Sequence, residues 1–156
     1  MQGPVLARDI MVKDLVTLKP QMDVFEAIER LLKHKISGAC VVDDEGQFLG
    51  VFTEKDCLSV LVNAAYDRLP TTRIRAFIST EVRTVNEETD VLTISQIFLN
   101  TPYRRLPVLT DGSLVGQISR RDVLRAVNLM DRPSGERGGQ LLYLSSLIAL
   151  EDAPIV

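Results

Sequence analysis

Apolar residues recur along the first half of the chain with two different periods, which predict short strands and amphipathic helices in a fixed order. A short apolar run at 16–18 predicts a strand that ends at Pro20. Asp23 then stands where an N-terminal helix cap is expected, ahead of apolar residues spaced i, i+3, i+4, i+7 and i+8. This spacing predicts one continuous buried helix face, formed by Val24, Ala27, Ile28, Leu31 and Leu32.

A hairpin and a second helix follow this first helix. Two short apolar runs, 39–42 and 48–52, are joined by the acidic, glycine-containing turn at 43–46. The second helix is predicted to begin after Thr53 and to end near Tyr66. Its apolar face consists of Leu58, Leu61, Val62 and Ala65. The first half of the chain is therefore predicted to be a βαββα unit.

The same order of elements returns about 67 residues later in the chain. The apolar strand at 106–109, for example, corresponds to the strand at 39–42. A unit of about 60 residues buries a sheet face and two helix faces poorly on its own, so we expect two units, residues 7–69 and 70–130, to pack together. The repeat predicts a mixed α/β (α+β) fold with pseudo-two-fold symmetry, with clefts where strands end and helices begin.

The C-terminal part of the chain lies outside this repeat. Residues 131–139 are polar and rich in turn formers, which predicts a linker. Residues 140–151 are mostly apolar and predict a short helix, too short to span a bilayer and without a basic polar face for a membrane surface. We expect this segment to cover a groove on its own unit or on a dimer partner.

Composition narrows the class of protein and of partner. Apolar residues make up 46% of the chain and charged residues 25%, an ordinary mixture for a soluble protein. The net charge of −3 offers no basic footprint for nucleic acid, and the N-terminus has no secretory signal pattern. Two cysteines fit a reducing cytoplasm, and the single histidine, His34, gives no basis for a metal site. We therefore expect a cytoplasmic protein without a metal, nucleic-acid or membrane partner.

One heptapeptide pattern occurs in both halves, at the junction between the hairpin and the following helix. It reads GVFTEKD at 50–56 and GQISRRD at 116–122. In each copy a hydroxyl residue, Thr53 or Ser119, stands at the expected N-cap and is followed three residues later by an aspartate. Many helices begin in this way for stability alone. The same geometry also offers free amide groups to a phosphate and a carboxylate to a ribose, and its duplication favours this functional interpretation.

The sequence contains no recognisable catalytic constellation. It has no nucleophile–base pair, no paired histidine or cysteine ligands, no P-loop and no dinucleotide-binding glycine motif. We therefore do not expect an enzyme.

The chain resembles a tandem pair of cystathionine-beta-synthase (CBS) domains, the Bateman module, over residues 7–130. The resemblance rests on the two heptapeptides, on the strands ISGACVV and RRLPVLT, and on the strands VTL and RTV that open each half. It implies a non-catalytic regulatory module that binds AMP, ADP, ATP or S-adenosylmethionine as a ligand and needs no cofactor. It also implies a homodimer that signals to a regulated protein partner. The alternative is a structural dimerisation module whose pockets are empty.

The resemblance also implies roles for particular residues. Asp56 and Asp122 would hold ribose hydroxyls in two separate pockets, with phosphate near Thr53 and Ser119. The adenine pockets of the family are lined by backbone and apolar side chains at strand edges. In one pocket these residues are Thr17, Ile36, Gly38 and Ala39. In the other pocket they are Thr84, Val85, Leu106 and Pro107.

The two halves differ at several of these positions. Pro107 stands where the first half has Cys40, and Arg105 stands where it has Gly38. Arginines concentrate in and before the second heptapeptide, at Arg104, Arg105, Arg120 and Arg121. Arginine binds phosphate oxygens bidentately, so we expect the second pocket to take the more highly phosphorylated ligand. The alternative is that these arginines are solvated or contact a dimer partner.

Overall fold

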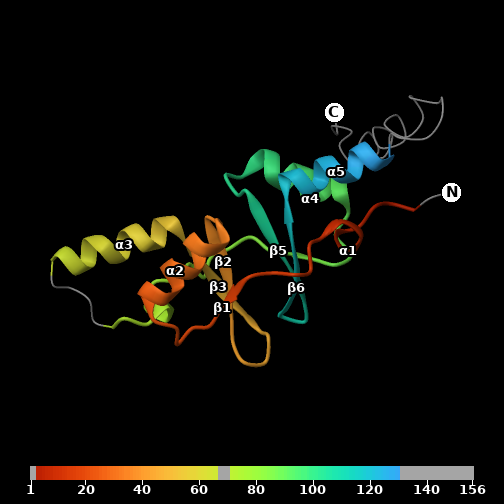
Figure 1. The fold of residues 1–156 in the computed structure, drawn as a ribbon. Helices are drawn as coiled ribbons and strands as arrows, with labels where there is room; N and C mark the ends of the chain where they lie inside the picture. Colours follow the sequence, from red (N-terminus) through yellow and green to blue (C-terminus); the bar gives the residue numbers. More distant parts are fainter. Residues whose placement is uncertain (1–2, 67–70, 131–156) are drawn as a thin grey trace, which may run out of the picture.

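The computed structural model describes residues 3–66 and 71–130, and the backbone alone for the last two of these (Figure 1). The predicted linker at 131–139 and C-terminal helix at 140–151 lie outside the described residues. No helix in the described ranges is long and apolar enough to cross a membrane.

Each half of the chain forms a three-stranded sheet and two helices in the predicted order. The first repeat consists of β1 (Thr17–Leu18), α2 (Val24–His34), β2 (Gly38–Val42), β3 (Phe48–Thr53) and α3 (Glu54–Ala65). The second repeat consists of β4 (Val85–Asn86), α4 (Val91–Asn100), β5 (Arg105–Thr110), β6 (Ser113–Ser119) and α5 (Arg120–Met130). In each sheet the central strand pairs in parallel with a two-residue strand and antiparallel with its hairpin partner. The predicted repeated βαββα fold is confirmed.

Two short elements that the sequence pattern did not predict are exchanged between the repeats: each precedes one repeat in the sequence and packs into the core of the other. The helix α1 (Ala7–Ile10) precedes the first repeat but packs into the core of the second, beside Val85 and Val91. The 3-10 helix η1 (Ile74–Ala76) precedes the second repeat but packs into the core of the first, where Ile74 is fully buried. Each core therefore contains a segment from the other side of the expected boundary near residue 70.

Equivalent hydrogen bonds hold the two exchanged segments. The amide of Val24 donates to the carbonyl oxygen of Thr72 at 2.7 Å, and the amide of Val91 donates to that of Val5 at 2.8 Å. Further along, Val51 exchanges a pair of backbone hydrogen bonds with Ser79, with N–O distances of 3.0 and 2.9 Å. The matching pair joins Val12 to Gln117 at 2.9 and 3.0 Å. This correspondence at a displacement of about 67 residues is the expected pseudo-two-fold relation.

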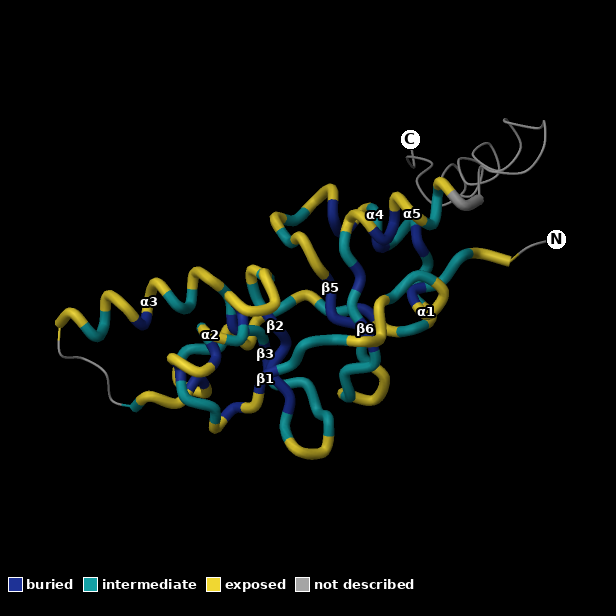
Figure 2. Tube along the Cα trace, viewed as in Figure 1, coloured by how far each residue is buried: buried dark blue, intermediate teal, exposed yellow. Residues whose placement is uncertain are grey.

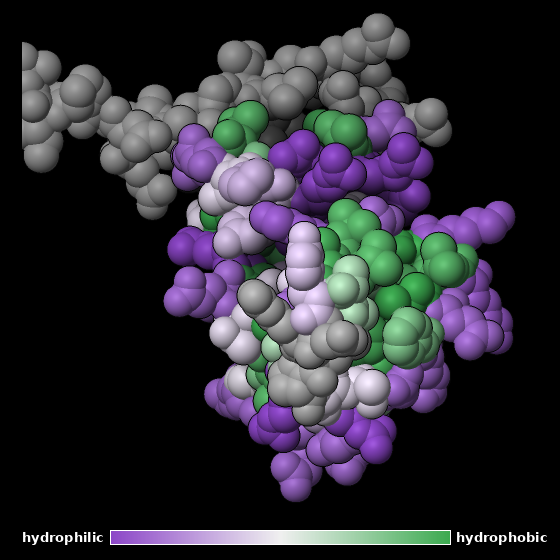
Figure 3. All heavy atoms as spheres, turned by 90° about the vertical axis from the view of Figure 1, so that its left-hand side faces the viewer, coloured by the Kyte–Doolittle hydropathy of each residue, from purple (hydrophilic) through white to green (hydrophobic). Residues whose placement is uncertain are grey.

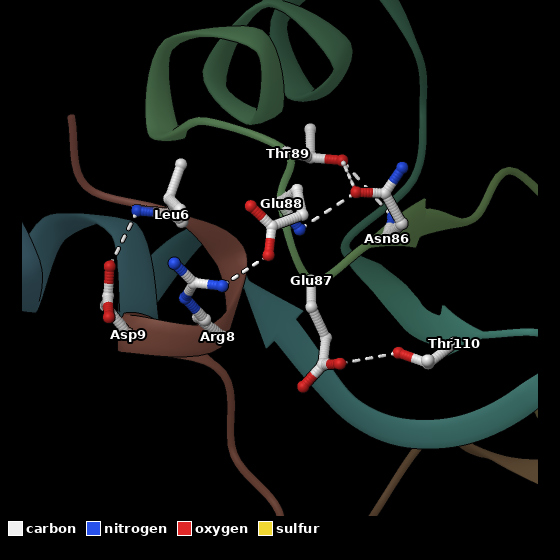
Figure 4. A network of polar contacts seen from close by, with 8 residues as sticks. All are labelled: Leu6, Arg8, Asp9, Asn86, Glu87, Glu88, Thr89 and Thr110. Atoms are coloured by element: carbon white, nitrogen blue, oxygen red, sulfur yellow. Dashed lines mark hydrogen bonds and ion pairs between the residues drawn. The ribbon is translucent and has the colours of Figure 1, made fainter.

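Side-chain contacts secure α1 on the second repeat (Figure 4). Arg8 forms an ion pair with Glu88, and the amide of Arg8 donates to the carbonyl oxygen of Glu87 at 3.1 Å. The carboxylate of Glu87 in turn accepts a hydrogen bond from the hydroxyl of Thr110 on β5, at 2.6 Å. The loop before α4 is thus fixed between α1 and the sheet.

The hairpin turns of the two sheets also contact each other. The amide of Phe48 donates to the carbonyl oxygen of Gly112 at 2.9 Å, and the amide of Leu114 donates to that of Gly46 at 3.1 Å. The side-chain amide of Gln47 donates to the hydroxyl of Ser113 at 2.8 Å. The two sheets are therefore tied directly, near the pseudo-two-fold axis.

The predicted apolar helix faces are only partly buried (Figure 2). On α2, Val24, Ala27 and Leu31 lie in the core, but Leu32 is 73% exposed. On α3 the buried residue is Val60, whereas the predicted apolar face is turned away from the core and is exposed along most of the helix. The expectation that the α2 face is continuously buried is therefore wrong at Leu32.

The N-terminal cap of α4 leads to a prediction about acid stability. The Oδ1 atom of Asp90 accepts hydrogen bonds from the amides of Leu92 and Thr93, both at 3.0 Å. Burial alone raises the pKa of Asp90, but hydrogen bonds from the Thr93 hydroxyl and from these amides outweigh it and lower the pKa. Because the pKa is lower in the folded state, the cap contributes fully above about pH 4 and loses its contribution as pH falls through the folded-state value.

We expect Asp90→Ala to lower the free energy of unfolding by about 1 kcal/mol at pH 7, measured by urea denaturation. The difference from the unmodified protein should shrink at pH 3. As a control, Asp44→Ala removes a carboxylate whose side chain is 94% exposed and should change stability little. An undiminished difference between Asp90→Ala and the unmodified protein at pH 3 would contradict this assignment.

Candidate functional site

The first heptapeptide forms a closed hydrogen-bonded cap at the start of α3. The carboxylate oxygen Oδ2 of Asp56 accepts hydrogen bonds from the amide of Thr53 at 2.8 Å and from its hydroxyl at 2.9 Å. The hydroxyl of Thr53 accepts in return from the amide of Asp56 at 3.4 Å. The motif therefore does cap the N-terminus of α3, which is the stabilising role that many helix starts of this type have.

The second heptapeptide repeats this cap at the start of α5. Oδ2 of Asp122 accepts from the amide of Ser119 at 2.7 Å and from its hydroxyl at 2.8 Å. The amide of Asp122 donates to the hydroxyl oxygen of Ser119 at 3.2 Å. In both copies, one carboxylate oxygen is used by the cap, and only Oδ1 is left for other partners.

The second carboxylate oxygens differ in their surroundings. Oδ1 of Asp56 accepts a hydrogen bond from the hydroxyl of Ser79 at 3.2 Å. The position equivalent to Ser79 in the other half is Val12, which has no hydroxyl, and Oδ1 of Asp122 instead lies 3.3 Å from Nη1 of Arg125. A ribose hydroxyl that binds Oδ1 would therefore share or replace the hydrogen bond from Ser79 at Asp56, and the one from Arg125 at Asp122.

A cleft of about 660 Å³ lies beside the first cap, and we call it the Thr53 cleft. It falls within the usual range of about 300–1,000 Å³ for small-molecule pockets. Its walls come from β2 and β3, from the exchanged segment after η1, and from the start of β5. The residues that line it include Gly38, Ala39, Cys40, Thr53, Glu54, Lys55, Ser79, Glu81, Val82, Tyr103, Arg104, Arg105, Pro107 and Gln117.

A smaller cleft of about 260 Å³ lies beside the second cap, and we call it the Ser119 cleft. Its walls come from the segment between α1 and β1, from the start of β2, and from β6 with the first turn of α5. The residues that line it are Val12, Asp14, Leu15, Val16, Ile36, Gly38, Arg105, Gln117, Ser119 and Asp122. The two clefts are pseudo-equivalent, because residues 12–16 correspond to 79–83 at the repeat displacement.

Each cleft combines residues of both repeats, which changes the expected grouping. Ile36 of the first repeat lies with Ser119 of the second, and Pro107 of the second lies with Thr53 of the first. Gly38 lines both clefts. The adenine-lining residues are therefore not grouped half by half as expected, since Ile36 and Ala39 lie in different clefts and Pro107 lies with Ala39.

Several residues implied by the resemblance lie outside these two clefts. Thr17 and Thr84 line two separate outer clefts, beside α2 and α4 respectively. Val85 and Leu106 are buried in the core of the second repeat. Arg121 is exposed on α5 and is not part of the lining of either central cleft. Asp56 touches the Thr53 cleft only through its hydrogen bonds to Thr53 and Ser79, which do line it.

Sequence reasoning missed several lining residues of the Thr53 cleft, among them Ser79, Val82 and Tyr103. For Tyr103 a signal was available, because it is the equivalent of Ile36 in the other half. Ser79 and Val82 belong to the exchanged segment, whose position no local pattern indicated.

The charge distribution changes the premise behind the expected ranking of the pockets. Arg104 and Arg105 lie in the Thr53 cleft together with Lys55, opposed by Glu54 and Glu81. The Ser119 cleft contains Arg105 as its one cationic residue among the lining side chains, beside Asp14 and Asp122. Arg104 therefore lines the cleft of the first motif and not that of the second, whereas Arg105 lines both.

The two thiols near the Thr53 cleft are unreactive by their environment. Burial raises the pKa of Cys40 to about 11, although the positive charge of Arg105 acts in the opposite direction. Burial also raises the pKa of Cys57, and the negative charges of Asp56 and Glu54 add to this. Both thiols are therefore protonated at neutral pH and are poor nucleophiles. Among the described residues, no group of three or more acidic, histidine or cysteine side chains is placed to hold a metal ion.

Comparison with known families agrees with this repeated architecture. The family model of the CBS domain matches residues 7–63 and, a second time, residues 74–129. The chain belongs to the CBS-domain family. The two matched regions each contain one of the capped heptapeptides, so the repeats described above are a CBS pair.

Curated relatives of this CBS pair are mostly longer proteins. An uncharacterized protein of Methanocaldococcus jannaschii is 31% identical over 119 residues, which are 76% of this chain and 41% of that protein. The chloroplastic CBS domain-containing protein CBSX1 of Arabidopsis thaliana is 30% identical over 151 residues and matches 80% of this chain and 64% of its own. The chain thus spans less than two thirds of each of these relatives.

Solved structures resemble the CBS pair over nearly their whole length. The crystal structure of CBSX2 from Arabidopsis thaliana in complex with AMP has a TM-score of 0.73 and 27% identity, covering 82% of this chain and 99% of that one. A CBS-domain protein from Agrobacterium tumefaciens has a TM-score of 0.65, also with 27% identity, covering 81% and 97% of the two chains.

Proposed function

We propose that this CBS pair is a non-catalytic regulatory module that binds an adenosine-containing ligand in its two central clefts. The observation that carries the proposal is the pair of clefts itself. In each cleft, the N-terminus of a helix, capped by Thr53 or Ser119, lies beside the first residues of a central strand from the other repeat. The complex of CBSX2 with AMP supports adenosine monophosphate as the first ligand to test. Occupancy would then be signalled to a protein partner through differential affinity for two conformations.

The two clefts suit adenosine ligands with different amounts of phosphate charge. The Thr53 cleft is larger and carries three cationic side chains, Lys55, Arg104 and Arg105, against two acidic ones. We assign the more highly phosphorylated ligand to this cleft, because guanidinium groups bind phosphate oxygens in pairs of hydrogen bonds. The Ser119 cleft is smaller and has a net negative lining, with Asp14 and Asp122 against Arg105. It suits a nucleoside or a ligand with little phosphate charge.

A thermal-shift panel of adenosine, AMP, ADP, ATP, S-adenosylmethionine and GMP tests this proposal. A ligand at a hundredfold excess over its dissociation constant should stabilise the folded protein by about 2.7 kcal/mol. We expect stabilisation by at least one adenosine compound and none by GMP at the same concentration. If no adenosine compound raises the melting temperature or gives heat in calorimetry, the structural dimerisation module with empty pockets takes its place.

The exposed apolar faces of α2 and α3 support the expected homodimer (Figure 3). Apolar side chains gather on the end of the molecule where these helices lie. The large residues exposed there include Phe25, Leu32, Leu58, Leu61 and Val62. An apolar patch of this kind marks an association surface more often than a free one. A second copy of the chain is the proposed occupant, since it brings the same apolar face.

We expect Leu61→Glu to convert a dimer into a monomer in sedimentation velocity experiments, because it places a charge in the centre of that patch. Leu61 is 64% exposed in the single chain, so the monomer should keep its folding stability within about 0.5 kcal/mol. Gln96→Glu adds the same charge at an exposed position of α4 and should leave the dimer intact. A monomeric unmodified protein, or a dimer that persists in Leu61→Glu, contradicts the proposed interface.

A further inference from the structure

The two central clefts share a wall at the pseudo-two-fold axis. Three residues line both of them, namely Gly38, Arg105 and Gln117. Gly38 and Arg105 are equivalent positions of the two repeats, so the arginine side chain has no counterpart on the other side of the axis. Among the described residues, Arg105 is therefore the one cationic residue that lines both clefts.

Arg105 is available to a ligand from either side. Its backbone is fixed at the first position of β5, where it pairs with Ser119 on β6. Its side chain makes no hydrogen bond or ion pair with any other described residue, and the residue is exposed. It lines the Thr53 cleft together with Cys40. The other cationic residues of the Thr53 cleft, Lys55 and Arg104, do not line the Ser119 cleft.

We propose that Arg105 is a single cation shared by both clefts, so that a phosphate bound in one cleft weakens the binding of a phosphate in the other. The inference rests on the proposed nucleotide-binding function and specifies its regulation. A guanidinium that forms two hydrogen bonds with one phosphate has its donors committed and its charge neutralised for a second phosphate. An uncharged ligand such as adenosine makes no such demand, and its binding in the two clefts is independent.

The test isolates each cleft by filling the other with a bulky side chain. Val82 lines only the Thr53 cleft, and its repeat equivalent Leu15 lies in the Ser119 cleft but not in the Thr53 cleft. Val82→Trp therefore leaves the Ser119 cleft open, and Leu15→Trp leaves the Thr53 cleft open. Each variant, with and without Arg105→Gly, is titrated with AMP and with adenosine by calorimetry. Where a tryptophan variant fails to fold by circular dichroism, phenylalanine replaces it.

A shared cation predicts that Arg105→Gly weakens AMP binding about ten- to hundredfold in both single-cleft backgrounds, the loss expected for hydrogen bonds to a charged group. Adenosine affinity should change little in either background. With both clefts open, the second AMP should bind more weakly than it does in the matching single-cleft variant, and Arg105→Gly should remove this difference. Arg104→Ala is the control, because it should weaken AMP only where the Thr53 cleft is open.

Other results have distinct meanings. If Arg105→Gly weakens AMP binding in only one single-cleft background, Arg105 serves that cleft alone and the proposed sharing is overturned. Unchanged AMP binding in both backgrounds would overturn the sharing as well. In those cases the nucleotide-binding proposal stands. Absence of binding by AMP and adenosine in the unmodified protein would overturn that proposal itself, and the sharing with it.

Discussion

Gly50→Ala is expected to lower the free energy of unfolding by about 3 kcal/mol, the upper end of the usual cost of overpacking a tight site. A Cβ atom at Gly50 would overlap the backbone carbonyl oxygen of Ser79 and lie 3.2 Å from its carbonyl carbon. The φ angle of Gly50 is also positive, at 157°. Neither the strand β3 nor the exchanged segment can move away without breaking the backbone pairing of Val51 with Ser79. Urea denaturation measures the loss.

The equivalent glycine of the second repeat provides a matched control. A Cβ atom at Gly116 would lie 2.5 Å from the sulfur atom and 2.8 Å from the Cγ atom of Met11, which move with its rotamer, and 3.1 Å from its Cβ atom, which would have to shift slightly. Gly116→Ala should therefore cost less than Gly50→Ala, because methionine can change its rotamer. Equal losses in the two variants would show that the contact with the Ser79 backbone is not the cause.

Tyr103→Ala is expected to weaken AMP binding in the Thr53 cleft by about ten- to hundredfold. The ring lines this cleft beside Pro107 and packs against the core of the second repeat. An aromatic side chain that stacks on a base contributes about 1–3 kcal/mol to binding. Calorimetric titration in the Leu15→Trp background measures this cleft alone.

Two variants sharpen the interpretation of Tyr103→Ala. Tyr103→Phe keeps the ring and should retain most of the affinity. Ile36→Ala, at the equivalent position, should affect the Ser119 cleft instead and leave AMP binding in the Thr53 cleft unchanged. If Ile36→Ala weakens AMP binding in the Thr53 cleft and Tyr103→Ala does not, the assignment of each residue to the cleft beside the other repeat's motif is wrong.

The elements of each repeat were predictable because their signals are local. Asp23 and Asp90 precede periodic apolar residues, and both cap their helices through backbone amides. Thr53 and Ser119 occupy the helix starts that the heptapeptides indicated. Such signals depend only on residues a few positions apart, so the tertiary arrangement does not change the helix starts that they predict.

The exchange of α1 and η1 was not predictable from the same signals. These elements have four and three residues, too few to show a helical period. Their positions depend on contacts such as those of Ala7 and Ile74 with the core of the other repeat. A local pattern therefore identified the two helix caps correctly but grouped Ile36, Pro107 and Arg104 with the motif of their own repeat, whereas each of them lines the cleft beside the other motif.

Periodicity on α3 indicated which residues share a face but not which face is buried. Leu58, Leu61 and Val62 lie on one face as predicted, and that face is exposed in the single chain. Val60 and Cys57 instead pack toward the core of the first repeat. The proposed homodimer would bury the exposed face.

The most direct measurement is the structure of the protein crystallised with AMP. The account predicts that AMP lies in the Thr53 cleft, with its base beside Tyr103 and its phosphate between Arg104 and the N-terminus of α3. Contacts from both repeats to one bound nucleotide are its central requirement. Density for AMP in the outer cleft that contains Thr17, or enclosed by residues of one repeat only, would contradict it.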